Sequence, residues 1–426
     1  MFVPEFIKDV ILKLNNNGYE AYLVGGAVRD AIMEYPVSDY DVTTNASLDD
    51  LRSVFSDEKV VGYSSGKTLL IIKGKEEVEI TPFKGDSLID DLSHRDFTMN
   101  AIAYDLNEFI DPFDGIGDIK RRIIKTPINP NETIEYEHTR LIRAIKFEAR
   151  YDMKIDSQLK KAMSNNAKLL LDINKERIRE DLNKILLSVK PSIYFNEHKE
   201  IFFTLFPALK DCYKFEQKSR WHHLDVFDHI MAVVDTVKQD LILRLAALYH
   251  DIKKPECFSI DERGGHFYNH FVLSAEYAKQ SMKEFRYSSD EIDRVYNLVL
   301  YHDRPLEDND KSVLKLINKF GLRDLDLYFA IKRADIISQN PQLIDRIYDM
   351  DNIASRCRRI VSNREYINRN TLNIKGNDII ALGFKPIHVK AILEGLVKMV
   401  IDNKVNNNYD DLLNQARKLY NINDNE

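Results

Sequence analysis

Three acidic residues in the first hundred positions have types and spacing that could support phosphoryl chemistry: Asp39, Asp41 and, further on, Glu79. Residues i and i+2 of a β-strand share a face, so the two aspartates would project together. Adjacent carboxylates repel each other unless a cation lies between them, and Mg²⁺ prefers such oxygen ligands. Glu79 follows a predicted hairpin turn at 73–76 and can complete the cluster. The trio predicts a magnesium site, although an acidic pair alone would more often be a solvated loop.

A glycine pair precedes the aspartates and could hold phosphate groups. The segment AYLVGGAVRDAI predicts a strand, a tight turn at Gly25 and Gly26, and a helix that begins near Ala27. A helix start presents free N–H groups to whatever lies over the turn, and Arg29 adds a positive charge. Most glycine pairs are simply tight turns, so this motif gains weight only beside the carboxylates.

A second set of chemical residues is spread over segments with helical periodicity: His229, His250, Asp251, His270, His302 and Asp335. The adjacent pair His250–Asp251 follows the apolar run LRLAALY. Burying two titratable groups requires a partner, and a metal ion is a good one. The alternative is an inert helical scaffold, because a lone histidine on a helix is usually a core or surface residue.

The elements that must position these residues change character near Ile119. The first 120 residues mix short β-type runs with turns, whereas the remainder has helical periodicity. A chain of 426 residues exceeds one ordinary core. We therefore expect an α+β fold in which a head of mixed sheet and helices is followed by all-helical parts. The predicted domains are a head at 1–120, a neck at 121–190, a body with the histidine site at 191–365 and a tail at 366–426.

Composition narrows the class of protein. The chain is 44% hydrophobic and has no apolar run long enough to span a bilayer, which predicts a cytoplasmic protein without membrane partners. Its net charge of −7 argues against a protein that coats nucleic acid. Two basic clusters could still bind phosphate locally, although a solvated helix face is the simpler interpretation of each: Lys120, Arg121, Arg122 and Lys125, then Arg140, Arg143, Lys146 and Arg150.

Four motifs in the head together resemble those of class II tRNA nucleotidyltransferases and bacterial poly(A) polymerases, in the polymerase-β superfamily. They are LVGGAVRD at 23–30, DYD at 39–41, RDFTMNA at 95–101 and DPFDG at 111–115. The resemblance implies a polymerase-β-like head that binds Mg²⁺ and adds CMP and AMP from CTP and ATP to tRNA 3′ ends.

The resemblance also assigns roles to individual residues. It implies that Asp39 and Asp41 bind the metal and that Glu79 assists the 3′-hydroxyl. The implied nucleotide contacts are Gly25, Gly26 and Arg29 on the triphosphate, and Arg95, Asp96 and Asn100 on the ribose and phosphates.

Two departures from the family pattern affect nucleotide choice. Alignment through Arg143 puts Glu137 and Arg140 at the family's base-reading pair, where i and i+3 would share one helical face. The simpler interpretation of that pair is an ordinary intrahelical ion pair. In addition, only residues 80–90 separate Glu79 from the pair Asp91-Leu92, where many relatives carry a longer loop. A CC-adding enzyme and a poly(A) polymerase therefore remain alternatives to CCA addition.

The histidine set resembles the HD phosphohydrolase superfamily in its order H…HD…D. The resemblance implies that His229, His250, Asp251 and Asp335 bind a divalent metal such as Mn²⁺, Ni²⁺ or Co²⁺, and that His270 and His302 supply further ligands. Similar HD domains act on 2′,3′-cyclic phosphates. The tail resembles the region of the family that contacts tRNA. The competing hypotheses are a phosphohydrolase with a regulatory nucleotide-binding head and a noncatalytic RNA-binding protein.

Overall fold

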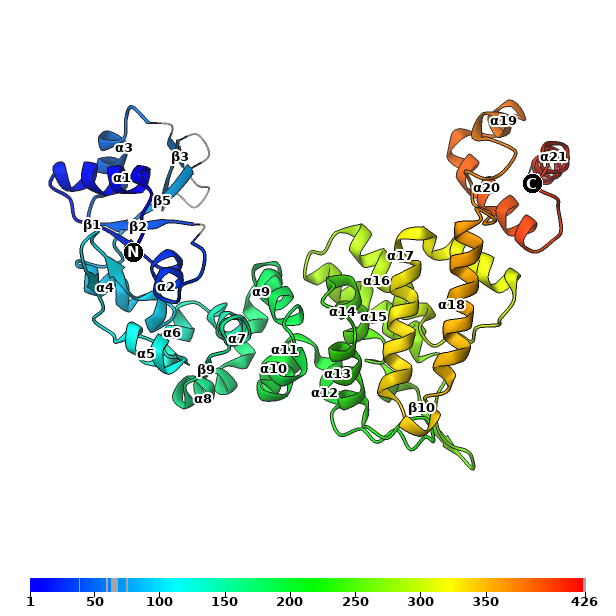
Figure 1. Ribbon diagram of the computed structural model, residues 1–426, viewed down its shortest axis with the longest axis horizontal. Helices are drawn as coiled ribbons and strands as arrows, with labels where there is room; N and C mark the ends of the chain where they lie inside the picture. Colours follow the sequence, from blue (N-terminus) through cyan, green and yellow to red (C-terminus); the bar gives the residue numbers. More distant parts are fainter. Residues whose placement is uncertain (38, 59, 63–67, 74–75, 424–426) are drawn as a thin grey trace. The chain divides into compact units, whose positions relative to one another are not determined.

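The computed structural model describes residues 1–37, 39–58, 60–62, 68–73 and 76–423. The chain divides into two compact units (Figure 1). One comprises Met1–Ser188 with Ile193–Leu205, and the other comprises Val189–Ser192 with Phe206–Glu426. The expected α+β class is confirmed, because the head contains a mixed sheet with helices and the parts that follow are mainly helical. The predicted four-part division into domains stays a prediction.

A mixed sheet organises the head. In the described part of the chain it has seven strands in the order β3-β4-β5-β2-β1-β6-β7. Only the β2–β5 pairing within this sheet is parallel. The strands are β1 (Ala21–Val24), β2 (Asp41–Thr44), β3 (Val60–Gly62), β4 (Leu69–Lys73), β5 (Glu76–Pro82), β6 (Ala103–Tyr104) and β7 (Phe109–Ile110). The head helices are α1 (Glu5–Asn16), α2 (Gly26–Ile32), α3 (Leu48–Val54), α4 (Leu88–Ser93) and α5 (Gly115–Arg121).

The predicted hairpin is confirmed by the antiparallel pairing of β4 with β5, although the turn residues Gly74 and Lys75 lie outside the described residues. Along β5, Val78 and Ile80 are buried and Glu79 between them is half-buried. This alternation is what a strand with one covered face requires. It leaves the Glu79 carboxylate on the face opposite to the core.

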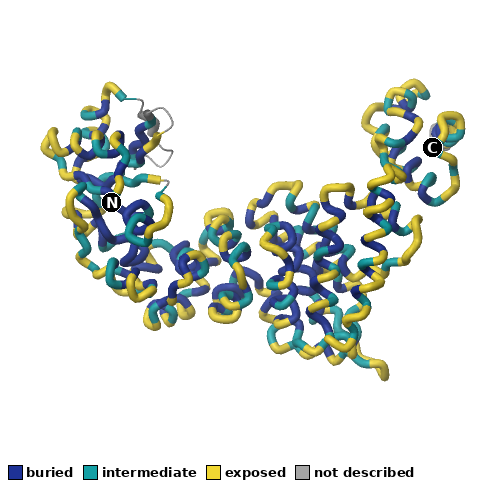
Figure 2. Tube along the Cα trace, viewed as in Figure 1, coloured by how far each residue is buried: buried dark blue, intermediate teal, exposed yellow. Residues whose placement is uncertain are grey.

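Helices follow the head in the first unit. They are α6 (Pro130–Tyr136), α7 (Arg140–Tyr151), α8 (Ser157–Asn165), α9 (Glu176–Leu186), α10 (Pro191–Glu197), whose first two residues belong to the other unit, and α11 (Lys199–Leu205). A short parallel pair of strands, β8 (Ile123–Ile124) and β9 (Lys154–Ile155), accompanies them. The amphipathic α7 buries Leu141, Ile145 and Phe147. Figure 2 shows this alternation of buried and exposed positions along the helices.

The second unit is built from longer helices around the histidine site. They are α12 (Pro207–Cys212), α13 (Val226–Thr236), α14 (Leu241–Tyr249), α15 (His270–Glu284), α16 (Ser289–Tyr301), α17 (Asp310–Ser338) and α18 (Arg346–Ser362). The expectation of all-helical parts is wrong at two places, the β8–β9 pair and an antiparallel hairpin of β10 (Phe258–Asp261) and β11 (Gly264–Phe267). Gly264 has φ +111°, which suits a tight hairpin turn.

The C-terminal helices have a small hydrophobic core of their own. They are α19 (Gly376–Ala381), α20 (Pro386–Ile401) and α21 (Tyr409–Asn423). Residues Ile374, Ile379, Leu396, Val397 and Leu412 are buried in this core. Across the described residues, none of the helices is both long enough and apolar enough to cross a bilayer.

Candidate active sites

Asp41 and Glu79 lie side by side on two parallel strands, with Asp41 at the start of β2 and Glu79 in the middle of β5. The register pairs Asp41 of β2 with Glu79 of β5, and the Glu79 amide donates to the Tyr40 carbonyl over 3.2 Å. Burial raises the pKa of Asp41, Glu79 and Asp39 raise it further, and Arg95 opposes them. A carboxylate held in this way gains by binding a cation, so the pair fits a divalent metal.

Asp39 lies outside the strand that the i, i+2 spacing assumes. Strand β2 begins at Asp41, because its pairing with β1 ends at Val24, where the Gly25 turn leaves the sheet. Asp39 is exposed, although it is close enough to raise the pKa of Asp41. Among the described residues, the three head carboxylates do not form a group whose ligand atoms all lie within 4.8 Å. Asp39 as a metal ligand therefore stays a prediction.

The glycine turn places the start of α2 over the carboxylates, as the sequence predicts. Gly25 has φ +71°, and a Cβ atom built on it would lie 3.2 Å from Asp41 Oδ2 and 3.3 Å from an Arg95 guanidinium nitrogen. Only glycine combines this conformation with such a close approach. Arg29 of α2 is buried, donates to Asp30 over 2.8 Å and to Asn100 over 2.7 Å, and stacks against Phe147.

A buried network connects three of the predicted nucleotide contacts. Asn100 donates to Asp96 over 2.7 Å, and Arg143 donates to Asp96 over 3.2 Å. Burial works to raise the pKa of Asp96, but Arg143, the Asn100 amide and Arg140 outweigh it and hold that pKa below its ordinary value. The charged carboxylate therefore fixes the orientation of both neighbours. The Nε atoms of Arg95 and Arg143 are buried without a hydrogen-bond partner in the described chain.

These side chains line a head cavity of about 510 Å³ with more positive than negative charge. The cations are Arg29, Lys84, Arg95, Arg140, Arg143 and Lys146, and the carboxylates are Asp41, Glu79, Asp91 and Asp96. Unpaired buried N–H donors beside such a cavity favour a polyanion such as a triphosphate. The simpler interpretation of the second basic cluster, a solvated helix face, is therefore wrong for Arg140 and Lys146, which are buried here.

Two charged residues that line this cavity were not predicted. Asp91 accepts from Arg95 over 3.0 Å and so fixes that guanidinium, while Lys84 lies two residues after the end of β5. Burial lowers the pKa of Lys84, and Arg140 and Arg95 lower it further. Asp91 falls on the helical face of Leu88 and Leu92, which was a usable signal, whereas nothing local in the sequence distinguishes Lys84.

Glu137 and Arg140 do not share a helical face. Helix α6 ends at Tyr136, Glu137 is extended, and α7 begins at Arg140. Thr139 donates to the Glu137 carboxylate over 3.0 Å, a local side-chain bond of the kind that competes with helix. Glu137 instead pairs with Arg177 of α9 at 2.6 Å and does not line the cavity.

Arg140 lines the cavity but has a different set of partners. Its guanidinium is buried, donates to the carbonyl oxygens of Thr133 and His94, and lies 5.3 Å from the Tyr136 ring centroid. The expected pair on one base edge is therefore absent from this arrangement. Base reading by either residue remains a prediction that requires them to exchange partners when nucleotide binds.

The predicted histidine set does converge in the second unit. Asp251 lies at its centre: Oδ2 is 3.3 Å from His229 Nε2 and 3.2 Å from His250 Nε2. Oδ1 is 3.1 Å from His270 Nε2 and 3.4 Å from His302 Nε2. Asp335 joins on the first side, 3.0 Å from His229 Nε2.

All four imidazoles point the same kind of nitrogen at the centre. Their Nδ1 atoms donate to backbone carbonyls, so each ring turns its Nε2 atom toward Asp251. The acceptors are Ser338 for His229 at 3.3 Å, Ala247 for His250, Phe267 for His270 and Val299 for His302, each of the last three at 2.7 Å. Backbone bonds of this kind orient metal-ligating histidines. Both Asp251 oxygens and His270 Nε2 are buried without a hydrogen-bond partner among the described atoms, so the donor set fits divalent metal.

The electrostatics of this centre also favour a cation. Burial works against the protonated form of His229, but Asp251 and Asp335 outweigh it and raise the pKa of His229 to about 9. Burial works to raise the pKa of Asp335, yet His229 and His250 hold it well below its ordinary value. Asp251 lies between two sets of ligands. His229 and His250 face its Oδ2 atom, and His270 and His302 face its Oδ1 atom, an arrangement suited to two metal ions.

The centre opens into a cavity of about 470 Å³. Residues that the sequence did not single out contribute to it, among them Lys254, His222 and Arg346. Lys254 pairs with Asp251 at 2.5 Å and lies 3.3 Å from His222 Nε2. The position of Lys254, one helical turn after the His250–Asp251 pair, was a usable sequence signal for this residue.

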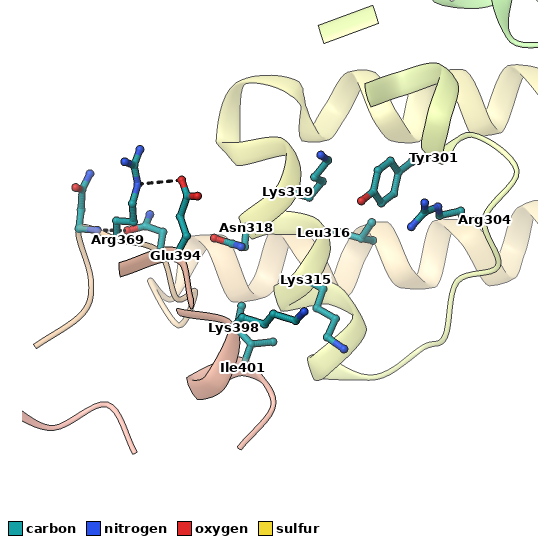
Figure 3. Close-up of a pocket in the computed structure, with 12 residues that line it drawn as sticks. Tyr301, Arg304, Lys315, Leu316, Asn318, Lys319, Arg369, Glu394, Lys398 and Ile401 are labelled. Atoms are coloured by element: carbon teal, nitrogen blue, oxygen red, sulfur yellow. Dashed lines mark hydrogen bonds and ion pairs between the residues drawn. The ribbon is translucent and has the colours of Figure 1, made fainter. Parts of the chain in front are cut away.

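A third cavity of about 740 Å³ lies between α17, α20 and the segment around Arg369 (Figure 3). It is lined by five cations, Arg304, Lys315, Lys319, Arg369 and Lys398, and by one carboxylate, Glu394. Lys315 pairs with Asp402 at 3.1 Å and Arg369 with Glu394 at 3.9 Å, while Arg304 lies 4.0 Å over the Tyr301 ring. The excess of positive charge suits a nucleic-acid backbone.

Comparison with known proteins supports this division of sites. A model of the poly A polymerase head domain matches residues 21–125, a model of the probable RNA and SrmB-binding site of polymerase A matches 152–212, and an HD domain model matches 220–339. The CCA-adding enzyme of Staphylococcus epidermidis is 34% identical over 217 residues, 46% of this chain and 54% of that enzyme. That of Staphylococcus saprophyticus is 27% identical over 403 residues, 89% of each.

Solved structures show the same fold. The Bacillus stearothermophilus CCA-adding enzyme in complex with CTP covers 100% of both chains with a TM-score of 0.67 and 21% identity. The Thermotoga maritima CCA-adding enzyme complexed with tRNA covers 98% of this chain and 96% of its own, with a TM-score of 0.57 and 16% identity.

The chain therefore combines a match to the poly A polymerase head domain with a match to the HD domain. It resembles the CCA-adding enzymes in sequence and in fold, as the motifs predict. Its match spans about half the length of several of those relatives, 54% and 50% in two cases.

Proposed function

We propose that this chain is a tRNA nucleotidyltransferase that adds CCA to 3′ ends from CTP and ATP. The observation that carries the proposal is the head cavity, where the Asp41–Glu79 pair faces an excess of arginine and lysine side chains. Bound Mg²⁺ would activate the 3′-hydroxyl and stabilise the leaving pyrophosphate. Asp41 and Glu79 would hold the metal, with Asp39 completing the set.

The remaining residues of the cavity position the nucleotide. The α2 start at Gly26 and the Arg29 guanidinium face the triphosphate. Asp96 holds Arg143 and, through Asn100, Arg29, so that their donors are already aimed before substrate binds. Such preorganisation is how a nucleotidyltransferase obtains rate without covalent chemistry of its own.

A CC-adding enzyme is the second candidate. Strand β5 ends at Pro82 and α4 begins at Leu88, so the connection is short. Asp91 accepts from the Lys84 amide over 3.1 Å and Ser87 caps α4 by accepting from Asp90 over 3.2 Å, which further constrains it. The CCA-adding names of the relatives favour full addition over CC addition and over poly(A) synthesis.

We also propose that the HD centre is a metal-dependent phosphohydrolase that acts on 2′,3′-cyclic phosphates at RNA ends. Mn²⁺, Ni²⁺ or Co²⁺ are the metals that imidazole and carboxylate ligands would select. The third cavity, with its five cations, would bind the RNA backbone. The protein would act in the cytoplasm.

The test uses the intact chain in parallel assays. Wild type, Asp41→Asn and His250→Ala are each offered tRNA lacking CCA with CTP and ATP, and a 2′,3′-cyclic phosphate with Mn²⁺, Ni²⁺, Co²⁺ or Mg²⁺. The proposal expects Asp41→Asn to lose only addition and His250→Ala to lose only hydrolysis. Wild type that adds no nucleotide would overturn the first proposal, and wild type that hydrolyses nothing with any metal would overturn the second.

A further inference from the structure

One cation at the HD cavity, Arg346, interacts electrostatically with Asp335 and Asp303 but forms no ion pair with either of them among the described residues. The charged groups that line this cavity, apart from its histidines, are Asp251, Asp303, Asp335, Lys254 and Arg346. Lys254 is already paired with Asp251 at 2.5 Å. Among the described residues, Arg346 forms no ion pair within 4.0 Å, although it lines the same cavity as the metal ligands.

The Arg346 guanidinium is nevertheless held in place. It donates to the Gln339 side-chain oxygen and, through Nε, to the Leu343 carbonyl over 3.3 Å. It also lies 4.7 Å from the centroid of the Trp221 ring. Gln339 is buried and donates to Asp335 Oδ1 over 2.9 Å, so one side chain connects the arginine with a predicted metal ligand.

The segment that carries Trp221 is itself tied to this region. Asn340 donates its amide to the Trp221 carbonyl over 2.8 Å and its side-chain nitrogen to the Arg220 carbonyl over 3.0 Å. The Trp221 ring is therefore a fixed surface against which the guanidinium rests. The Arg346 side chain is therefore already ordered before a ligand binds, which reduces the entropy lost on binding.

We propose that Arg346 is the phosphate-binding residue of the HD site, which grips the non-bridging oxygens of a phosphate ester whose other side faces the metal ligands. With Nε and one Nη2 hydrogen committed, the remaining guanidinium N–H groups are available to a ligand in the cavity that Arg346 lines, and arginine suits two oxygens of one phosphate. Trp221 and Gln339 act as positioning residues. This inference rests on the proposed phosphohydrolase function of the same site.

The experiment measures binding of inorganic phosphate by titration calorimetry to the full chain loaded with Mn²⁺ and freed of unbound metal. Four proteins are compared: wild type, Arg346→Gln, Arg346→Lys and Arg220→Gln. Arg220 is the matched control, because it lies 4.5 Å from the same Trp221 ring but does not line the cavity. Bound Mn²⁺ and the thermal midpoint are measured for each protein.

We expect Arg346→Gln to weaken phosphate binding about 10- to 100-fold, the loss typical of a charge-assisted contact, with unchanged bound Mn²⁺. Arg346→Lys should fall between, and Arg220→Gln should bind like wild type. In hydrolysis of bis(p-nitrophenyl) phosphate, Arg346→Gln should raise KM more than it lowers kcat.

Phosphate affinity that is unchanged in Arg346→Gln would overturn the inference. Equal losses in Arg346→Gln and Arg220→Gln, or loss of Mn²⁺ from Arg346→Gln, would also overturn it, because the role would then be structural. If wild type hydrolyses no ester but its phosphate binding depends on Arg346, the proposed hydrolase function fails and the assignment of Arg346 stands.

Discussion

Gly25→Ala offers a sharp test of the head site, because the structure supplies both the perturbation and its control. Gly25 has φ +71° and ψ −134°, a region that residues with a Cβ avoid at a cost of about 1–3 kcal/mol. The added methyl group would also lie 3.2 Å from Asp41 Oδ2 and 3.3 Å from Arg95. Gly18 has φ +86° with nothing within 4 Å of a built Cβ, so Gly18→Ala carries backbone strain without the contacts.

Both variants should lose stability to urea, by about 1–2 kcal/mol for Gly18→Ala and slightly more for Gly25→Ala. Their activities should differ. Relief of the two close contacts requires Asp41 and Arg95 to move by a few tenths of an ångström, and an error of about 1 Å costs roughly 100-fold in rate. Single-turnover addition of CMP to tRNA lacking CCA should therefore fall about tenfold in Gly25→Ala and remain unchanged in Gly18→Ala. Equal rates in the two variants would refute the placement of Gly25 over the metal site.

Four further outcomes are expected. Asp41→Ala should abolish nucleotide addition and retain the wild-type circular dichroism spectrum; appreciable addition would contradict its role as a metal ligand. Asp251→Ala should lose bound Mn²⁺ and phosphohydrolase activity while addition continues, measured by metal analysis and both assays; retained Mn²⁺ would count against the site. Arg140→Ala should lower the free energy of unfolding by about 3 kcal/mol, because the Thr133 and His94 carbonyls lose a charged donor, and an unchanged urea midpoint would disprove this. The pKa of Asp96 is held below its ordinary value, so its charge stabilises the fold above about pH 4 and this contribution is lost as the pH falls further. The free energy of unfolding should therefore decrease less between pH 5 and pH 3 in Asp96→Asn than in wild type.

The elements that carry local signals were predictable. The glycine turn before α2, the β4–β5 hairpin and the burial of His250–Asp251 after an apolar helix each follow from a short window of sequence. The convergence of the histidine set was implied by resemblance, since helices far apart in sequence bring it together. The Nδ1–carbonyl bonds that orient each ring could not be read from residue types.

The errors arose where a distant partner decided the outcome. The i, i+3 spacing of Glu137 and Arg140 assumes a continuous helix, but Thr139 bonds the Glu137 carboxylate and Arg177, forty residues later, pairs with it. The i, i+2 spacing of Asp39 and Asp41 assumes that the strand includes both. Strand β2 starts only at Asp41, because its neighbour β1 ends at Val24.

Addition of CCA is tested most directly with the purified wild-type chain and tRNA that lacks the CCA end. The products are sized at nucleotide resolution. With CTP alone we expect two added nucleotides. With CTP and ATP together we expect three, after which addition stops. The same chain should add one nucleotide to tRNA ending in CC when ATP is offered. A stop after two nucleotides with both substrates present, or a long run of added A, would contradict CCA addition.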